Sequence, residues 1–197
     1  IAPDQDIAQL QQQIHSQLGE RIVVKPRAEG SAIGVMRLTR FSDHTEALRT
    51  ALQWPSGGLA EPYIDGLEVT VGVLDLHGQP PQATPAIAVE TAQGEWYDFE
   101  NRYAAGKSQH LIPAPLPEPV LQQLQTIALG AHHALGLRDL SRSDFLVAQD
   151  HTVTLLETNT LPGMTPTSLF PDGAAALGLD FPALVKALVE SALRRSA

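Results

Sequence analysis

Two short segments, residues 142–147 and 152–159, constrain the fold of this chain more than any other feature. β-Branched and other apolar side chains dominate both segments, and the stretch between them is mostly polar, which is typical of two strands joined in a hairpin. Asp150 and His151 lie at the centre of that stretch, so we place the tip of the hairpin there. The chain is therefore expected to contain an antiparallel sheet in its last third.

A hairpin with this tip places two carboxylates opposite each other. Asp144 faces Glu157, and because side chains alternate between the two faces of a strand, Arg142 and Asn159 share that face. Like charges about 5 Å apart on neighbouring strands destabilise a sheet unless something neutralises them. A Mg²⁺ ion, which prefers carboxylate and amide oxygens, would do so through Asp144, Glu157 and Asn159. The alternative is a solvated edge of the hairpin without a ligand.

The composition of the chain argues against several classes of protein. Its 197 residues, 43% of them hydrophobic, suffice for one domain or for two small lobes. The net charge of -9 argues against a nucleic-acid-binding surface but is compatible with a local phosphate site. The absence of cysteine excludes disulfides, thiolate nucleophiles and zinc–sulfur centres, and no apolar run reaches the length of a membrane span.

Helical and strand-like segments are mixed along the chain, which indicates an α+β fold with mixed or antiparallel sheets flanked by helices. The pattern predicts four helices, over residues 6–18, 45–52, 120–135 and from 181 onward, the second capped by Ser42 or Asp43 and the last by Asp180. Further strands are predicted over residues 21–25, 35–38, 59–61 and 68–76. The connector at residues 54–58 divides the chain into a first lobe, 1–58, and a second lobe, 59–197.

A second candidate site follows the first predicted strand. Lys25 ends that strand, so its charge lies at a fixed point, and the small residues Gly30, Ser31 and Gly34 follow it. Small residues leave backbone N–H groups accessible to phosphate oxygens. The pattern differs from a Walker loop because the lysine precedes the glycines. The alternative is an ordinary surface turn.

A third segment, residues 97–103, concentrates aromatic and charged side chains in a chain that is only 5% aromatic. Arg102 is placed to contact a phosphoryl group and Tyr103 to donate a hydrogen bond at a reaction centre. The alternative is that these aromatic residues anchor a long loop to the core. No histidine has the spacing of a metal ligand and no serine lies in a nucleophile-elbow motif, which argues against a zinc site and a hydrolase triad.

In their order and spacing, these motifs together resemble the D-alanine–D-alanine ligases of the ATP-grasp superfamily. The resemblance extends from the first predicted strand to the last helix. It rests on four groups of residues: Glu29–Gly30–Ser31 with Gly34, Tyr97–Asp98 with Tyr103, Arg142 with Asp144, and Glu157–Thr158–Asn159–Thr160 with Pro162–Gly163–Met164–Thr165. The resemblance implies an ATP-grasp fold and the ATP-dependent joining of two D-alanines through an acyl phosphate, for peptidoglycan precursor synthesis.

The resemblance also implies roles for single residues. The nucleotide would be bound by Lys25, Glu29, Gly30, Ser31, Ala32, Glu61, Tyr63, Ile64, Glu68 and Arg102. Two Mg²⁺ or Mn²⁺ ions would be bound by Asp144, Glu157 and Asn159. Catalytic roles would fall to Ser31, Tyr103, Arg142 and Gly163. The substrate would be bound by Arg142, Gly163, Ser168 and Leu169.

In this family an N-terminal domain and a further nucleotide-contacting lysine would precede Ile1. The resemblance therefore implies that residues 1–58 are the remainder of the central ATP-grasp lobe and residues 59–197 the C-terminal lobe. It implies a cytoplasmic enzyme that takes D-alanine and ATP, binds neither nucleic acid nor membrane, and forms a homodimer at full length. Two alternatives stay open: a carboxylate–amine ligase for another amino-acid pair, and a nucleotide-binding fragment that is inactive without the N-terminal domain.

Overall fold

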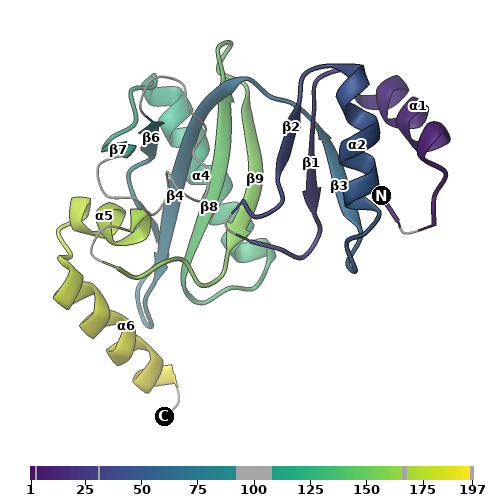
Figure 1. Cartoon of the computed structure of the whole chain (residues 1–197). Coiled ribbons are helices and arrows are strands. Elements are labelled where there is room, and N and C mark those ends of the chain that lie inside the picture. Colours follow the sequence, from purple (N-terminus) through teal and green to yellow (C-terminus); the bar gives the residue numbers. More distant parts are fainter. Residues whose placement is uncertain (3, 31, 92–107, 166–167, 196–197) are drawn as a thin grey trace. The chain divides into compact units, whose positions relative to one another are not determined.

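The computed structural model describes residues 1–2, 4–30, 32–91, 108–165 and 168–195 (Figure 1). The chain divides into two compact units, of which the first is Ile1–Ile64 and the second begins at Asp65. Each unit has its own antiparallel sheet and its own helices, which confirms the predicted α+β class. Within the described ranges, no helix has both the length and the apolar character needed to cross a bilayer.

The first unit is a three-stranded sheet in the order β2-β1-β3 with two helices packed on it. Its core joins Leu10 and Ile14 of one helix, Leu48 of the other, and Ile22 and Val24 of the central strand. Its elements are α1 (Ile7–Leu18), β1 (Ile22–Pro26), β2 (Met36–Leu38), α2 (Phe41–Ala51) and β3 (Gly58–Pro62).

Two boundaries in this unit differ from the sequence-based expectation. Helix α2 begins earlier than predicted, and Asp43, which was expected to cap it, instead pairs with Arg40 at 3.2 Å. Strand β3, which was expected in the second lobe, pairs with β1 along its whole length. The reason is the connector at residues 54–58, where the Gly57 N–H donates to the Trp54 carbonyl at 2.9 Å and turns the chain back onto the first sheet.

The second unit is built on a larger sheet in the order β7-β6-β4-β8-β9, with the short β5 paired to β4. Strands β5 to β7 lie in a stretch without a predicted pattern, and α5 was not predicted at all. The elements are β4 (Gly66–Asp75), β5 (Gln82–Ala83), β6 (Ile87–Thr91), β7 (Ser108–Leu111), α4 (Glu118–Ala134), β8 (Asp139–Ala148), β9 (Val153–Asn159), α5 (Leu169–Ala176) and α6 (Phe181–Arg195).

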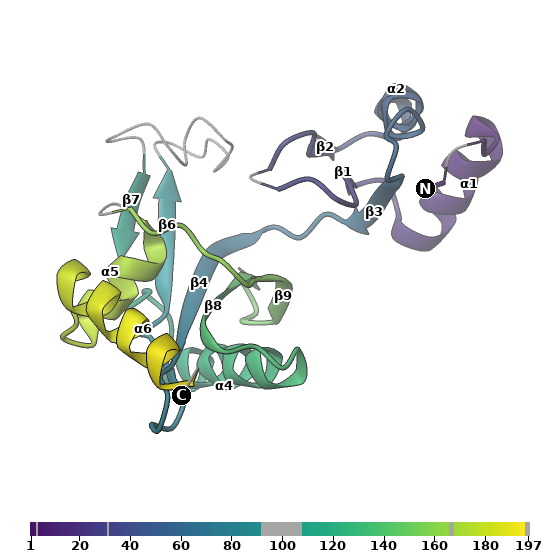
Figure 2. The same ribbon diagram turned by 90° about the horizontal axis from the view of Figure 1, so that it is seen from below.

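Side chains along β4 and β8 point alternately to the two faces of the second sheet, and the two faces differ in what packs on them. Helix α4 covers one face of the sheet (Figure 2). The contact includes Val71 and Phe145, which are both almost fully buried. On the other face, Leu74 packs against Phe170 of α5 and Leu184 of α6. Arg142 and Asp144 of β8 belong to this second face, so the candidate site lies on the side of the sheet that α5 covers and not on the side that α4 covers.

The hairpin of β8 and β9 has the predicted register at the site. Asp144 pairs with Glu157, and Arg142 pairs with Asn159. These four side chains are therefore on one face of two neighbouring strands, as the alternation in the sequence predicted.

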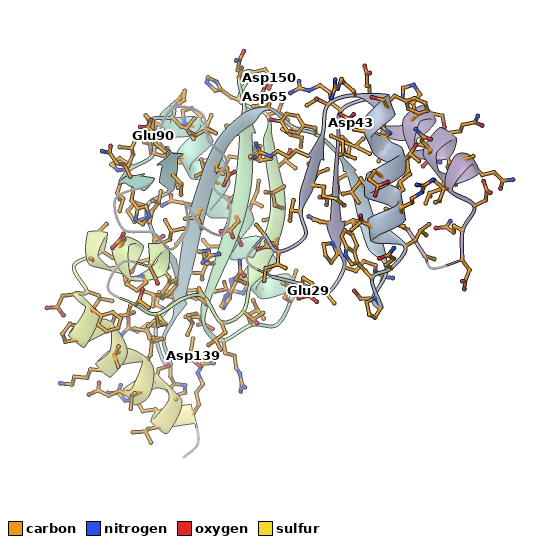
Figure 3. The ribbon with its side chains drawn as sticks, viewed as in Figure 1. Glu29, Asp43, Asp65, Glu90, Asp139 and Asp150 are labelled. Atoms are coloured by element: carbon orange, nitrogen blue, oxygen red, sulfur yellow. The ribbon has the colours of Figure 1, made fainter. Side chains whose placement is uncertain are left out.

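The tip of the hairpin differs from the expectation, because the loop has three residues, 149–151, and not two. The Ala148 N–H donates to the Thr152 carbonyl at 3.0 Å, and His151 takes a left-handed conformation with φ of 67°. The Thr152 N–H donates to Asp150 at the tip (Figure 3) and lowers the pKa of this carboxyl below its ordinary value. A β-bulge at Leu156 then restores the register of the site.

Burial of apolar side chains explains why this irregular register is adopted. In the observed pairing, Val153 faces Val147 and packs against the core on α4. A regular hairpin centred between Asp150 and His151 would turn Thr154 toward that core in place of Val153. A one-residue slip moves every side chain to the other face, so the core selects the register with the bulge.

The left-handed residue at the tip gives a stability prediction. His151→Gly removes the steric cost of that conformation, about 1–2 kcal/mol, and adds about 0.5–1 kcal/mol of unfolded-state entropy. We expect the variant to be more stable by about 0.5–1 kcal/mol in urea unfolding. The matched control is His133→Gly, which places the same change on the exposed last turn of α4 and should lower stability. A loss of stability in His151→Gly would contradict the loop conformation.

Candidate functional site

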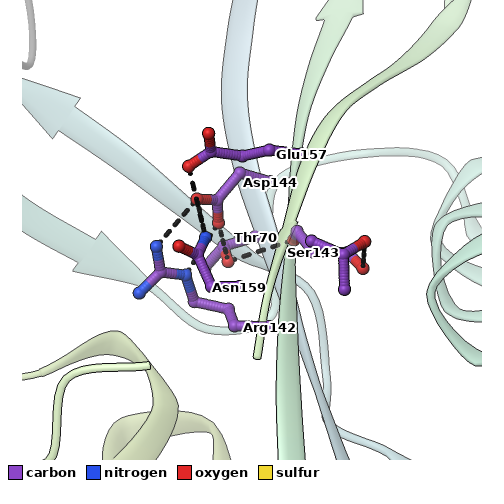
Figure 4. A network of polar contacts seen from close by, with 7 residues as sticks. Thr70, Arg142, Ser143, Asp144, Glu157 and Asn159 are labelled. Carbon is purple, nitrogen blue, oxygen red and sulfur yellow. Dashed lines mark hydrogen bonds and ion pairs between the residues drawn. The ribbon is translucent and has the colours of Figure 1, made fainter. Parts of the chain in front are cut away.

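Asp144 is the centre of a network of hydrogen bonds on the second sheet (Figure 4). Arg142 donates through Nε and Nη2 to the two carboxylate oxygens, each at 2.8 Å. The Thr70 hydroxyl donates to Oδ1 at 2.7 Å, and the Asn159 amide donates to Oδ2 at 3.1 Å. Each carboxylate oxygen therefore accepts two hydrogen bonds, which uses the acceptor capacity of Asp144 and fixes its orientation.

Asn159 lies between the two opposed carboxylates. Its Nδ2 is 3.1 Å from Asp144 Oδ2 and 3.3 Å from Glu157 Oε1. The structure thus brings together the three residues that the sequence predicted as metal ligands. The amide N–H group partly offsets the repulsion between the two carboxylates. A cation bound between them would offset it more fully.

The chemistry of these side chains fits a hard divalent cation. Turning the Asn159 amide about its Cβ–Cγ bond would present its oxygen beside those of Asp144 and Glu157. Among the described residues, no group of three His, Cys, Asp or Glu side chains lies close enough to hold a metal ion. A cation here would therefore have two carboxylates and one amide from the protein, and its other ligands would be water or substrate oxygens.

The start of α5 lies on the face of the sheet that carries Asp144. The helix can approach this face closely because a glycine, Gly72, stands at the point of contact on β4. Gly72 pairs with Arg142, and a Cβ at Gly72 would lie 2.9 Å from the Phe170 ring. The absence of that Cβ lets Phe170, in the first turn of α5, pack directly on β4. Helix α5 therefore begins beside the strands that carry the carboxylate cluster.

Three predicted substrate-binding residues meet at the start of α5. The Ser168 hydroxyl accepts a hydrogen bond from the Thr165 N–H at 3.1 Å. A Cβ at Gly163 would lie 3.0 Å from the same hydroxyl oxygen, so the Gly163 backbone is close to Ser168. Leu169 follows as the first helical residue and is buried. The loop therefore gathers polar backbone and hydroxyl groups on the site face.

In the first unit, Lys25 and Glu61 form an ion pair of 2.7 Å between β1 and β3. Close to these strands, the Tyr63 ring has the guanidinium groups of Arg21 and Arg37 over it, at 4.3 and 5.5 Å from the ring centroid. These cation–π contacts hold the ring in place. Three predicted nucleotide-binding residues of this unit thus have defined positions.

The predicted phosphate loop is a turn in the structure. Glu29 and Gly30 are exposed, and the Ile33 N–H donates to the Gly30 carbonyl at 3.1 Å. Ala32 has a φ of 58°, in the left-handed region. The geometry alone is that of a tight surface turn, and a phosphate-binding role for it stays a prediction.

Two further predicted nucleotide-binding residues, Ile64 and Glu68, are half-buried and lie in different units. The predicted residues Ser31, Arg102 and Tyr103 lie outside the described part of the chain.

Thr70 is a member of the cluster that the sequence reasoning missed. It faces Asp144 across β4 and β8 and is only 3% exposed. A signal was present in the sequence, because Val69, Val71 and Val73 alternate along the predicted strand and so share one face, which places Thr70 on the other. A polar residue at the centre of the strand therefore pointed to the site face.

Comparison with solved structures gives the class of this fold, which is that of ATP-grasp ligases. A D-alanine–D-alanine ligase from Bacillus anthracis complexed with ATP matches with a TM-score of 0.75 and 27% identity, over 97% of this chain and 57% of that chain. D-alanyl-alanine synthetase A from Vibrio cholerae matches with a TM-score of 0.78 and 26% identity, over 94% and 56% of the two chains.

Sequence comparison then gives the family. The model of the D-ala D-ala ligase C-terminus matches residues 3–190, and the chain belongs to this family. A D-alanine–D-alanine ligase of Nitratidesulfovibrio vulgaris is 43% identical over 173 residues, which are 88% of this chain and 55% of the relative. That of Pelotomaculum thermopropionicum is 39% identical over 182 residues, 92% of this chain and 56% of the relative. The resemblance inferred from the motifs is confirmed, and the chain spans just over half the length of these relatives.

The packing of α5 on Gly72 gives a second prediction. In Gly72→Ala the new methyl group would meet Phe170 at 2.9 Å and Thr84 at 3.0 Å, and overpacking of this kind costs about 1–3 kcal/mol. We expect this loss in the free energy of unfolding, measured with urea. The matched control is Gly130→Ala in α4, where nothing lies within 4 Å of the new Cβ and stability should rise by about 0.5–1 kcal/mol. Equal effects of the two substitutions would contradict the close approach of α5.

Proposed function

We propose that these residues belong to an ATP-dependent ligase that joins two D-alanines. The carboxylate of the first D-alanine would attack the γ-phosphate of ATP, giving an acyl phosphate and ADP. The amine of the second D-alanine would then attack the acyl carbon, and phosphate would leave as the dipeptide forms. The observation that supports this proposal is the cluster of Asp144, Glu157 and Asn159 beside Arg142, in a chain whose relatives are named D-alanine–D-alanine ligases.

Asp144, Glu157 and Asn159 would hold Mg²⁺ or Mn²⁺, and we propose that two ions bind. Bound there, the ions would neutralise negative charge on the phosphate oxygens of the nucleotide. Binding a cation needs an acceptor site on Asp144 that Asn159 now uses. The amide would therefore turn from donor to ligand, while Arg142 and Thr70 keep the carboxylate in place.

Arg142 would stabilise the negative charge that develops on the acyl oxygen. Its guanidinium is held by Asp144 at two nitrogen atoms and its side chain is only 13% exposed, so its plane is fixed before substrate binds. Fixed donors in a water-poor site stabilise a transition state more than mobile ones, because they need no reorganisation. The Gly163 N–H would be the second donor to this oxygen.

The remaining residues would bind the second D-alanine and the nucleotide. Ser168 and Leu169 would hold the carboxylate of the second D-alanine at the start of α5. Lys25 would bind phosphate, with Glu61 holding its charge in position, and Glu61, Tyr63, Ile64 and Glu68 would bind the adenosine part. For Glu29, Gly30 and Ala32 we propose contacts to phosphate through the turn, and for Ser31, Arg102 and Tyr103 the roles that the family motifs imply. We place the reaction in the cytoplasm, where ATP is supplied.

Removal of either carboxylate tests the proposed metal site. In the protein expressed from its complete reading frame, Asp144→Asn and Glu157→Gln should each lower Mg²⁺-dependent phosphate release by at least about 100-fold. The physical reason is that an amide binds Mg²⁺ much more weakly than a carboxylate. Mn²⁺ binding, measured by water proton relaxation, should weaken in parallel.

The matched control is Asp150→Asn, which removes a carboxylate from the exposed tip of the same hairpin. This variant should keep wild-type turnover and Mn²⁺ binding. Full activity of Asp144→Asn and Glu157→Gln would contradict the proposed metal site.

The substrate assignment has its own test. Phosphate release from ATP should require D-alanine and give D-alanyl-D-alanine as the product, identified by mass spectrometry. L-Alanine should not replace D-alanine in either position. Release with a different amino-acid pair and none with D-alanine would support another carboxylate–amine ligase.

A further inference from the structure

Helix α5 carries the proposed substrate-binding residues Ser168 and Leu169 at its start, and three strands hold it on the sheet. Leu169 packs on Ile87 and Val89 of β6, and Phe170 packs on Gly72 of β4. These contacts are apolar and therefore have little directional preference. They fix which face of the helix packs on the sheet, but they restrain small rotations about its own axis less sharply than a directional hydrogen bond does.

A polar contact to the third strand supplies that direction. His110 of β7 donates from Nδ1 to Asp172 Oδ2 of α5 at 2.6 Å. An ionised carboxylate only accepts hydrogen bonds, so Nδ1 carries the proton. The contact is charge-assisted and short, which makes it strongly directional.

The contact at Asp172 also determines the position of Ser168, because both residues belong to the first turn of α5 and its N-cap. The Asp172 N–H donates to the Ser168 carbonyl at 3.2 Å, so the two residues lie one turn apart on the same side of the helix. A rotation of α5 that breaks the contact with His110 would move the Ser168 hydroxyl and the Leu169 backbone with it.

We propose that His110 and Asp172 are positioning residues for the second amino-acid site. This inference rests on the proposed function, in which Ser168 and Leu169 hold the carboxylate of the second D-alanine. Neither His110 nor Asp172 is among the residues proposed to hold the nucleotide or the metal, so the effect of the pair falls on the affinity for one substrate.

The exposure of the pair indicates that its main role is not stability. The side chains of His110 and Asp172 are 19% and 30% exposed, and ion pairs that water can reach contribute little to the free energy of unfolding. We therefore expect the loss of this contact to change substrate binding more than folding.

Two substitutions of His110 separate positioning from packing, in the protein expressed from its complete reading frame. His110→Phe keeps a ring of similar size but removes the donor, whereas His110→Asn keeps an N–H group close to the position of Nδ1. His110→Phe should raise the KM for the second D-alanine by about tenfold, with kcat and the KM for ATP changed by less than about twofold. His110→Asn should restore most of the affinity.

A double-mutant cycle and a control complete the kinetic test. Asp172→Ala should have the same effect as His110→Phe, and the double variant should be no worse than either alone, because both remove the same contact. Lys186→Ala removes an exposed ion pair with Glu190 on α6 and should leave every constant unchanged.

Amide hydrogen exchange over α5 gives a readout that needs no catalysis. In His110→Phe the amides of α5 should exchange about fivefold faster than in the wild type, while those of α4 stay unchanged. Unchanged exchange together with an unchanged KM would overturn the inference, as would a parallel loss of affinity for all three substrates. If the wild type forms no D-alanyl dipeptide, the proposed function fails, and the exchange of α5 still decides whether His110 positions the helix.

Discussion

The second sheet must accommodate two negative charges that face each other on neighbouring strands, those of Asp144 on β8 and Glu157 on β9. Asp144 and Glu157 can face each other only because donors surround Asp144 from three directions. Arg142 comes from the same strand, Thr70 from β4 and Asn159 from β9. Strand β8 lies between β4 and β9, and this strand order brings a donor to Asp144 from the strand on each side.

The site was predictable from the sequence to the extent that it depends on the alternation of faces along a strand. Alternation placed Arg142, Asp144, Glu157 and Asn159 together, and the pairing confirms it. The tip was predicted wrongly, because a three-residue loop with a left-handed His151 replaces the expected two-residue turn. The bulge shifts the register by one residue before the strand reaches Glu157. The site therefore has the expected pairing, although the part of the hairpin between the site and the tip is irregular.

The parts that could not be predicted depend on contacts between distant residues. Helix α5 is short and contains Pro171 and Gly173, which gives it little intrinsic helix propensity. It forms where Phe170 packs on Gly72, nearly a hundred residues earlier in the chain. His110 and Asp172 are likewise far apart in sequence, and no local pattern marks them as partners. Strand β3 was placed in the wrong lobe for the same reason, since its partner β1 precedes it by a helix and another strand.

The bulge at Leu156 has a consequence for the solubility of the molecule. In the described part of the chain β9 is the last strand of its sheet, and Leu155 and Leu156 are 38% and 40% exposed on it. A straight, apolar edge strand invites a strand of another molecule to pair with it, which leads to aggregation. The extra residue bends and twists the strand at this point and interrupts the regular spacing of its backbone groups. The same irregularity that aligns Glu157 with Asp144 thus makes this edge a poor template for intermolecular sheets.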